Sequence, residues 1–316
     1  MAKHSIKGAS KLPQPDSVTS CLRRLTKLRV YNAKYGEAPH KPLLLFVLIE
    51  LAERDELPND ILLLTPELAF RFDTFWEVGA YRRPQPPDVR LPFHHLGGDD
   101  LLSRFMDSGE PSPDATLTRF VRLDTEFVAA ARDSGFRDQA RRFLIARYFQ
   151  PAERNALFHL IGMPIPPDDQ IAADASYEVP EDAERKGREA RFRLDIVPAY
   201  NYTCALTGYR VTTIAAGSIV DAAHIHEFSD SRNNDPGNGV ALCKNAHWLF
   251  DAGLWSIDDE YRVIVAKGAF SESSPNQKPV SDFHGQTLLL PANQSIWPSL
   301  KHLAWHRKKF KFDTAT

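Results

Sequence analysis

The feature that most constrains the fold is one stretch in the second half of the chain, residues 219–251. An apolar run ends at His224, and a polar loop, the pair Asn238-Gly239 and a second apolar run follow. A segment with helical spacing then carries His247. Short apolar runs bounded by turn residues predict strands, and an Asn-Gly pair is a strong turn signal. The order therefore predicts a strand, a loop, a second strand and a helix packed as one local unit.

Composition indicates the class of protein. A chain of 316 residues with 43% hydrophobic residues predicts a soluble globular protein, and the usual size of about 150 residues a domain suggests two domains. The formal net charge of −2 excludes a basic coat over the whole surface, so any nucleic-acid surface must be local. The longest apolar run, residues 42–49, is shorter than the roughly 20 residues that cross a bilayer. Three distant cysteines and no secretory-signal pattern indicate reduced thiols, and we expect a cytoplasmic protein.

The distribution of apolar residues predicts an α+β protein with a mainly helical first domain. Helical spacing covers residues 21–31, 41–53, 137–148 and 183–195. The polar residues 1–20 predict a loose arm, and the proline- and glycine-rich residues 78–98 predict a loop or strand edge. A linker over residues 166–182 would separate domains at residues 1–165 and 183–316.

The constrained stretch resembles the ββα-metal motif of HNH endonucleases. The resemblance is carried by the Ala-Ala-His-Ile strand, the Asn-Gly turn and the Leu-Cys-x-x-x-His helix. It implies a C-terminal nuclease domain that hydrolyses DNA phosphodiesters with a divalent metal, Mg²⁺ or Mn²⁺. His224 would be the base that deprotonates water, Asn238 would hold the turn and orient that base, and His247 would bind the metal. Neutral imidazole suits both histidine roles because it has one free lone pair.

The second metal ligand is harder to assign. Many members of the family have an acidic residue directly before the base, where this chain has Ala223. We therefore expect Asp221 to serve, with Asp251 in reserve. Regular strand alternation would place Asp221 on the opposite face from His224 unless the strand twists or bulges. His226 is expected to be a substrate-side or structural residue.

Many HNH domains also bind a structural zinc through two Cys-x-x-Cys pairs. This chain has one cysteine of each pair, Cys204 and Cys243, with Thr207 and Ala246 at the partner positions. Two sulfurs cannot complete a four-cysteine tetrahedral site, so we expect no structural zinc.

The first domain resembles the sulfur-binding domain that precedes HNH domains in modification-dependent (type IV) restriction endonucleases. The resemblance is carried by residues 38–45, Phe75-Trp76 and residues 89–96, although Leu91 stands where the family often has tyrosine. That family reads phosphorothioated DNA with a small apolar pocket flanked by basic residues. The resemblance implies pocket residues Arg82, Arg83, Arg90, Leu91, Pro92, Phe93, His94 and His95. A proline-rich surface loop with scattered charges is the open alternative.

These features predict an endonuclease that cuts double-stranded DNA near phosphorothioates, in restriction or defence. Phosphate contacts in the nuclease domain are expected from Arg191, Arg307, Lys308 and Lys309. A reader of methylated or hydroxymethylated cytosine and a catalytically inactive DNA-binding protein remain as alternatives. Whether two copies pair as a homodimer stays open.

Overall fold

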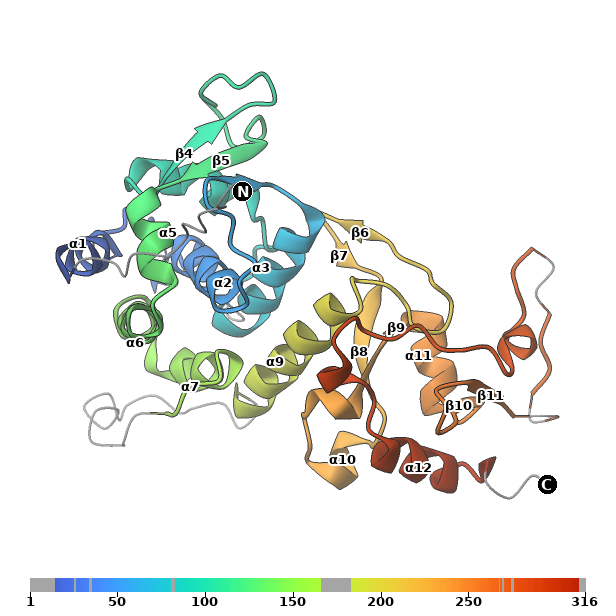
Figure 1. Ribbon diagram of the computed structural model, residues 1–316. Helices are drawn as coiled ribbons and strands as arrows, with labels where there is room; N and C mark the ends of the chain where they lie inside the picture. Colours follow the sequence, from blue (N-terminus) through green and yellow to red (C-terminus); the bar gives the residue numbers. More distant parts are fainter. Residues whose placement is uncertain are drawn as a thin grey trace, which may run out of the picture. The chain divides into compact units, whose positions relative to one another are not determined.

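The computed structural model describes residues 15–25, 27–33, 36–80, 83–165, 183–266, 268, 270–273 and 276–312 (Figure 1). It forms two compact units. The first contains the described parts of Met1–Leu64 and Gly79–Arg154, and the second contains those of Thr65–Val78 and Asn155–Thr316. The linker predicted over residues 166–182 lies outside the described residues, so the predicted domain boundaries stay a prediction.

The first unit is mainly helical and is built around one apolar helix. Its helices are α1 (Pro15–Leu25), α2 (His40–Glu53), α4 (Arg90–His95), η1 (Leu96–Gly98), α5 (Thr125–Ala131) and α6 (Ser134–Tyr148), and α7 (Pro151–Leu160) follows. Helix α2 is buried from Pro42 to Ala52 and contacts α4, α5 and α6. A helix that is apolar all round must be covered on every side, which places α2 at the centre of this unit.

Small sheets complete the first unit. Strands β3 (Ile61–Leu63), β5 (Phe120–Leu123) and β4 (Leu102–Phe105) form an antiparallel sheet in that order. Strands β1 (Asn32–Ala33) and β2 (Gly36–Glu37) pair as a separate hairpin. Because short sheets are added to a helical core, the unit agrees with the predicted mainly helical first domain.

Two predictions about this unit are wrong. Residues 90–98 form α4 and η1 instead of a loop or strand edge. A proline is tolerated in the first turn of a helix because its missing N–H would have had no partner there, and Pro92 lies in the first turn of α4. Helix α1 begins at Pro15, inside the predicted arm, and ends at Leu25, well before the predicted end near residue 31.

The second unit mixes helices with short strands. Its helices are α3 (Pro66–Gly79), α9 (Ala183–Ala199), α10 (Phe228–Ser231), η3 (Pro236–Asn238), α11 (Lys244–Asp251), η4 (Val280–Phe283), η5 (Gln294–Ile296) and α12 (Leu300–Lys309). Its strands are β6 (Thr212–Thr213), β7 (Gly217–Ser218), β8 (Val220–His224), β9 (Gly239–Cys243), β10 (Trp255–Ile257) and β11 (Val263–Val265). They pair in order along the chain as three antiparallel hairpins. The predicted α+β class is confirmed.

The β8–β9 hairpin is the centre of the second unit. Its register is regular, from Val220 opposite Cys243 to His224 opposite Gly239, and α9 and α11 pack against it. A Cβ atom on Gly239 would lie 2.4 Å from Cδ1 of Ile196 in α9. Glycine at the start of β9 thus allows the hairpin and α9 to approach closely.

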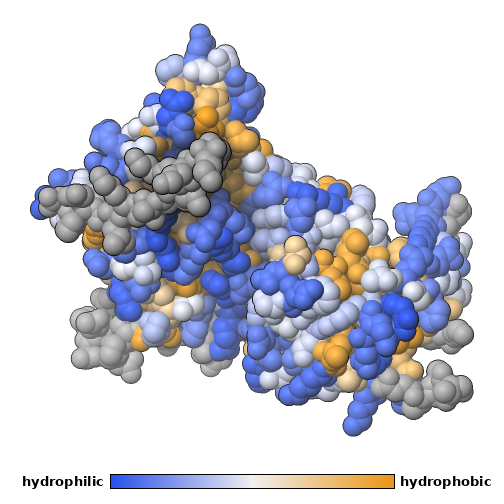
Figure 2. All heavy atoms as spheres, viewed as in Figure 1, coloured by the Kyte–Doolittle hydropathy of each residue, from blue (hydrophilic) through white to orange (hydrophobic). Residues whose placement is uncertain are grey.

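The hydropathy of the described residues decides whether one of their helices could span a membrane. The face drawn in Figure 2 is mostly hydrophilic and carries separate hydrophobic patches. Across the described part of the chain, no helix is both long enough and apolar enough to span a bilayer.

Candidate functional site

The ββα unit brings the three signature residues to the ends of its elements. His224 is the last residue of β8, Asn238 directly precedes β9, and His247 lies in the middle of α11. The predicted order of strand, loop, strand and helix is the order observed. A histidine at a strand end can point its ring out of the sheet toward a ligand while the backbone stays paired.

The His224 ring is held on two sides. It stacks on Phe192 of α9 with ring centroids 4.0 Å apart, and its Nε2 lies 2.8 Å from Oδ1 of Asn234. An amide oxygen only accepts, so Nε2 carries the proton in this arrangement. The other ring nitrogen, Nδ1, then has the free lone pair and can accept a proton.

Burial lowers the pKa of His224 below its usual value. The hydrogen bond to Asn234 and the charge of Glu189 oppose this shift, while the charge of His247 adds to it. A lowered pKa keeps the imidazole neutral at pH 7, which is the form a base needs. A cavity of about 470 Å³, lined by His224, Asp221 and Phe228 among others, gives a ligand access to the ring.

Asn238 holds the loop between the two strands. Its fully buried side chain accepts from the backbone N–H of His226 at 2.8 Å and donates to the carbonyls of His226 and Asn233 at 2.9 and 3.0 Å. The predicted turn-holding role fits these bonds. The side chain that contacts the His224 ring directly is Asn234, a residue that was not predicted from the sequence. Its polar loop was visible in the sequence, but nothing there distinguished Asn234 from its neighbours.

His247 and Asp251 form an adjacent imidazole–carboxylate pair. They are one helical turn apart on α11, with His247 Nε2 3.4 Å from Asp251 Oδ2. Burial, with the charge of Glu227, raises the pKa of Asp251, while His247, His224 and Lys309 oppose the shift. A carboxylate that is partly desolvated gains from a nearby cation. An imidazole beside a carboxylate oxygen is a donor set that suits a divalent metal.

Asp221, the predicted second ligand, has a different partner. Its Oδ1 lies 3.3 Å from Nε of Arg193, and Arg193 also pairs with Glu77 at 3.1 Å. No bulge interrupts the register of β8, yet Asp221 and His224 both line the cavity of about 470 Å³. The Arg193 guanidinium is thus shared between the carboxylates of Asp221 and Glu77.

One other cluster consists of residue types that commonly bind metals, but an arginine side chain occupies it. Within the described residues, Cys21, Asp124 and Glu126 are the only three ligand-type residues whose donor atoms all lie within 4.8 Å of one another. The guanidinium of Arg24 fills this cluster, with Nη2 2.7 Å from Asp124, 3.0 Å from Cys21 Sγ and 3.6 Å from Glu126. A cation would have to displace it, so this cluster is an ion-pair site.

The first unit contains a cavity of about 550 Å³ beside α4. We call it the α4 cavity; its lining residues include Leu91, Pro92 and His95 from α4. Burial, together with the charge of Arg83, lowers the pKa of His40 at its wall to about 4. The cavity therefore combines apolar side chains and neutral imidazoles with cations. Those cations, Arg29, Lys41 and Arg104, were not predicted from the sequence.

The other predicted pocket residues lie elsewhere. Phe93 and His94 are buried in the core, with His94 Nδ1 2.7 Å from Thr118 Oγ1, and neither is among the residues that line the α4 cavity. Arg90 forms a two-point ion pair with Asp88, at 2.8 Å for both bonds. Arg83 donates to the backbone carbonyl of Glu37. Arg82 lies outside the described residues.

Comparison with known proteins identifies the ββα segment. Residues 204–258 match the family model of HNH endonucleases. The predicted HNH motif is confirmed, and the match supports a nuclease. No curated protein matches the chain.

Two solved structures are weakly similar to this chain. A modification-dependent restriction endonuclease, TagI, is 19% identical over 38% of this chain and 37% of its own, with a TM-score of 0.29. The sulfur-binding domain of SprMcrA, complexed with phosphorothioated DNA, is 19% identical over 46% of this chain and 94% of its own, with a TM-score of 0.38. TM-scores of this size establish neither a shared fold nor a shared ligand.

The cysteines of the HNH segment form a hydrogen-bonded pair. The contact between Cys204 and Cys243 lowers the pKa of the Cys204 thiol and raises that of Cys243, and Thr207 Oγ1 lies 4.0 Å from Cys243 Sγ. Ala246 offers no donor atom. Two thiols and a hydroxyl do not fit a tetrahedral zinc site, and the absence of structural zinc stays a prediction.

The four residues predicted to contact phosphate in the second unit differ in burial and in the ion pairs that they already make. Arg307 is buried and donates to the Ile257 carbonyl at 2.8 Å and to Asp259 at 2.7 Å, so its guanidinium is held inside the second unit. Arg191 pairs with Asp195 at 3.0 Å. Lys309 pairs with Glu227, and Lys308 is exposed. A run of charges in a sequence does not reveal which of its members point inward.

Proposed function

We propose that this chain is a modification-dependent DNA endonuclease whose second unit hydrolyses a phosphodiester bond. The observation that carries the proposal is the hydrogen bonding of the His224 ring. Its Nε2 donates a hydrogen bond to Asn234, so its Nδ1 keeps the lone pair that can accept a proton. His247 and Asp251 supply donors for a divalent cation in the same unit.

Each residue of the proposed site has a separate role in hydrolysis. His224 Nδ1 accepts a proton from water, whose oxygen bonds to phosphorus as the bond from phosphorus to the leaving oxygen breaks, and the leaving oxygen takes a proton from solvent. Phe192 and Asn234 keep the ring in place during this transfer. His247 and Asp251 would hold Mg²⁺ or Mn²⁺, which would neutralise charge on the phosphate and the leaving oxygen when bound. Asn238 keeps the loop that carries Asn234 in its conformation.

The α4 cavity is the proposed reader of the modification, and phosphorothioate is the proposed ligand. Sulfur is more weakly hydrated than oxygen, so the apolar walls of Leu91 and Pro92 favour it. Arg29 and Arg104 can balance the charge of the linkage. A methylated-cytosine reader would need aromatic rings to stack on a flipped base. In the described lining, Tyr31 is the only phenylalanine, tyrosine or tryptophan, which favours the sulfur ligand.

One cleavage assay tests the proposal as a whole. The full chain is incubated with phosphorothioated, cytosine-methylated and unmodified duplexes, with Mn²⁺ or with a chelator. We expect cleavage of the phosphorothioated duplex alone, only with the metal, and a loss of about 10²- to 10⁴-fold in His224→Ala. Cleavage by His224→Ala at the wild-type rate would remove this residue from the mechanism. Preference for the methylated duplex would replace the sulfur ligand, and no cleavage of any duplex would leave a DNA-binding protein.

A further inference from the structure

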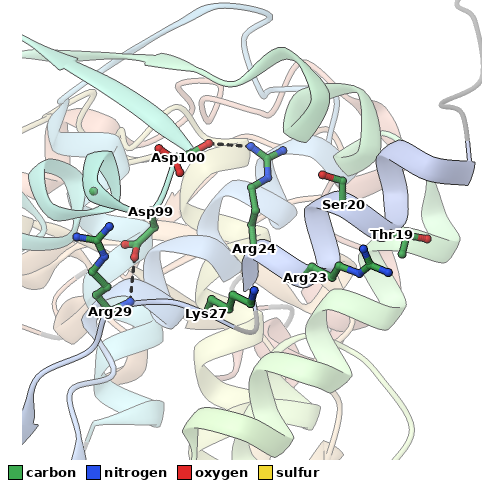
Figure 3. A pocket seen from close by; sticks show the side chains of 9 residues that line it. Thr19, Ser20, Arg23, Arg24, Lys27, Arg29, Asp99 and Asp100 are labelled. Atoms are coloured by element: carbon green, nitrogen blue, oxygen red, sulfur yellow. Dashed lines mark hydrogen bonds between the residues drawn. The ribbon is translucent and has the colours of Figure 1, made fainter.

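The first unit has a second cavity that the proposed function does not use. It measures about 700 Å³ and lies between α1 and the turn after η1 (Figure 3). We call it the α1 cavity. Helix α1 and the residues after it contribute the cations Arg23, Arg24, Lys27 and Arg29, and the opposite wall carries Asp99 and Asp100.

Of the two acidic residues on that wall, Asp99 already has its charge neutralised by a lysine outside the α1 cavity. The Asp99 side chain is only 2% exposed, and its Oδ2 pairs with Lys41 Nζ at 2.5 Å. Its Oδ1 accepts from the backbone N–H of Arg29 at 2.9 Å. The negative charge of Asp99 therefore does little to balance the cations that line the α1 cavity.

Only some of the basic side chains that line the α1 cavity already have hydrogen-bond or ion-pair partners. Arg24 is fixed by Asp124 at 2.7 Å and by the carbonyl of Asp100 at 2.7 Å. Lys27 and Arg29 are exposed, and their side-chain nitrogens have no partner among the residues that the structure describes. These two cations outnumber the exposed carboxylate of Asp100, so the α1 cavity keeps a positive surplus that suits an anion.

The α1 cavity and the α4 cavity are adjacent. Arg29 and Gly98 line both. Phosphates along one DNA strand follow each other at a rise of about 3.4 Å per nucleotide. A strand that runs from the α4 cavity past Arg29 and Gly98 therefore brings a neighbouring phosphate close to the α1 cavity.

We propose that the α1 cavity binds an ordinary phosphodiester of the same DNA strand, beside the linkage read in the α4 cavity. The inference rests on the proposed role of the first unit in binding DNA. Arg23 and Lys27 would supply charge without contacting the modified linkage, because neither lines the α4 cavity. The α1 cavity then raises affinity for any DNA, and the choice of modification stays with the α4 cavity.

The test is the salt dependence of DNA binding by the full chain, measured in a chelator so that no cleavage occurs. In Arg23→Gln/Lys27→Gln, we expect at least tenfold weaker binding of both phosphorothioated and plain duplexes. The slope of log Kd against log salt should fall by about 0.9 for each lost contact. The ratio of the two affinities should stay as in the wild type.

The matched control removes equal charge elsewhere in the first unit. Arg122→Gln/Arg142→Gln changes two exposed arginines that line neither cavity, and wild-type affinity and slope are expected. If the two double variants behave alike, the α1 cavity binds no phosphate. If the wild type shows no sulfur preference but Arg23→Gln/Lys27→Gln still loses affinity and slope, the sulfur ligand is wrong and the phosphate site stands.

Discussion

At the scale of single residues, the protonation of His224 governs the proposed chemistry. Burial lowers its pKa below the ordinary value of 6.5, so the neutral base persists as the pH falls through 6.5. The acid limb of log kcat/KM against pH should therefore have its midpoint below 6.5. Rates at saturating Mn²⁺ over a pH series measure it. A midpoint above 6.5 would mean that a different group acts as the base.

The partner of that base can be tested separately. Asn234→Ala should lower kcat by about 10- to 100-fold, the usual cost of losing a residue that orients a functional imidazole. Asn245→Ala is the control, because this asparagine is exposed on α11. Equal rates for the two variants would show that the contact of 2.8 Å with Asn234 does not position His224.

A third prediction concerns the metal ligands. Asp251→Asn should weaken Mn²⁺ binding by about tenfold or more, since it removes one of two proposed ligands. Asp221→Asn should leave it near the wild-type value, because Arg193 already pairs with this carboxylate. Calorimetric titration of both variants with Mn²⁺ measures the two affinities and decides which carboxylate is the ligand. The reverse result would restore Asp221 as the ligand.

At the scale of elements, the spacing between α9 and the β8–β9 hairpin supports the site. An added Cβ on Gly239 would lie 2.4 Å from Cδ1 of Ile196 and 2.8 Å from Cζ of Phe192, and both neighbours are buried. Gly239→Ala should therefore cost about 1 to 3 kcal/mol of unfolding free energy. It should also lower the cleavage rate, because Phe192 stacks on His224. Urea unfolding measures the stability.

The control for this change is another glycine of the same loop. A Cβ on Gly237 would have its nearest neighbour at 3.6 Å, an ordinary contact. Gly237→Ala should thus change stability by less than Gly239→Ala. Equal losses would show that the close approach of α9 is not what requires glycine at residue 239.

The elements also show what the sequence could predict. The HNH segment was predictable because its strands, Asn-Gly turn and helix are local, and spacing alone orders His224, Asn238 and His247 along them. Helix α4 was missed because proline counts against a helix in general, although Pro92 lies in a first turn where it is tolerated. Asn234 and Arg307 depend on which way a side chain points. That direction is decided by tertiary packing, which residue spacing does not encode.

At the scale of the whole molecule, the two units are not consecutive in the chain. Residues of α3 belong to the second unit although they lie between segments of the first. A fragment of residues 1–165 would separate α3 from the contacts that Phe70 and Glu77 make with Tyr202 and Arg193. Recognition should therefore be measured on the full chain.

The last prediction tests recognition in that full chain. Pro92→Ala keeps α4 helical but removes apolar surface from the α4 cavity, so the preference for phosphorothioated over plain duplex should fall. One apolar contact to sulfur is worth about 1 to 3 kcal/mol, or on the order of ten- to hundredfold in affinity. Both duplexes carry the same charge, so salt should weaken both complexes in parallel while their ratio stays nearly constant.

The control variant for recognition is Leu117→Ala, which removes an exposed apolar side chain that lines neither cavity. Its preference should equal that of the wild type. If Pro92→Ala also keeps the wild-type preference, α4 does not read the sulfur. A wild-type protein that binds both duplexes equally but prefers methylated cytosine would assign the cavity another ligand. The roles of His224, His247 and Asp251 in cleavage would not change, because those residues belong to the second unit.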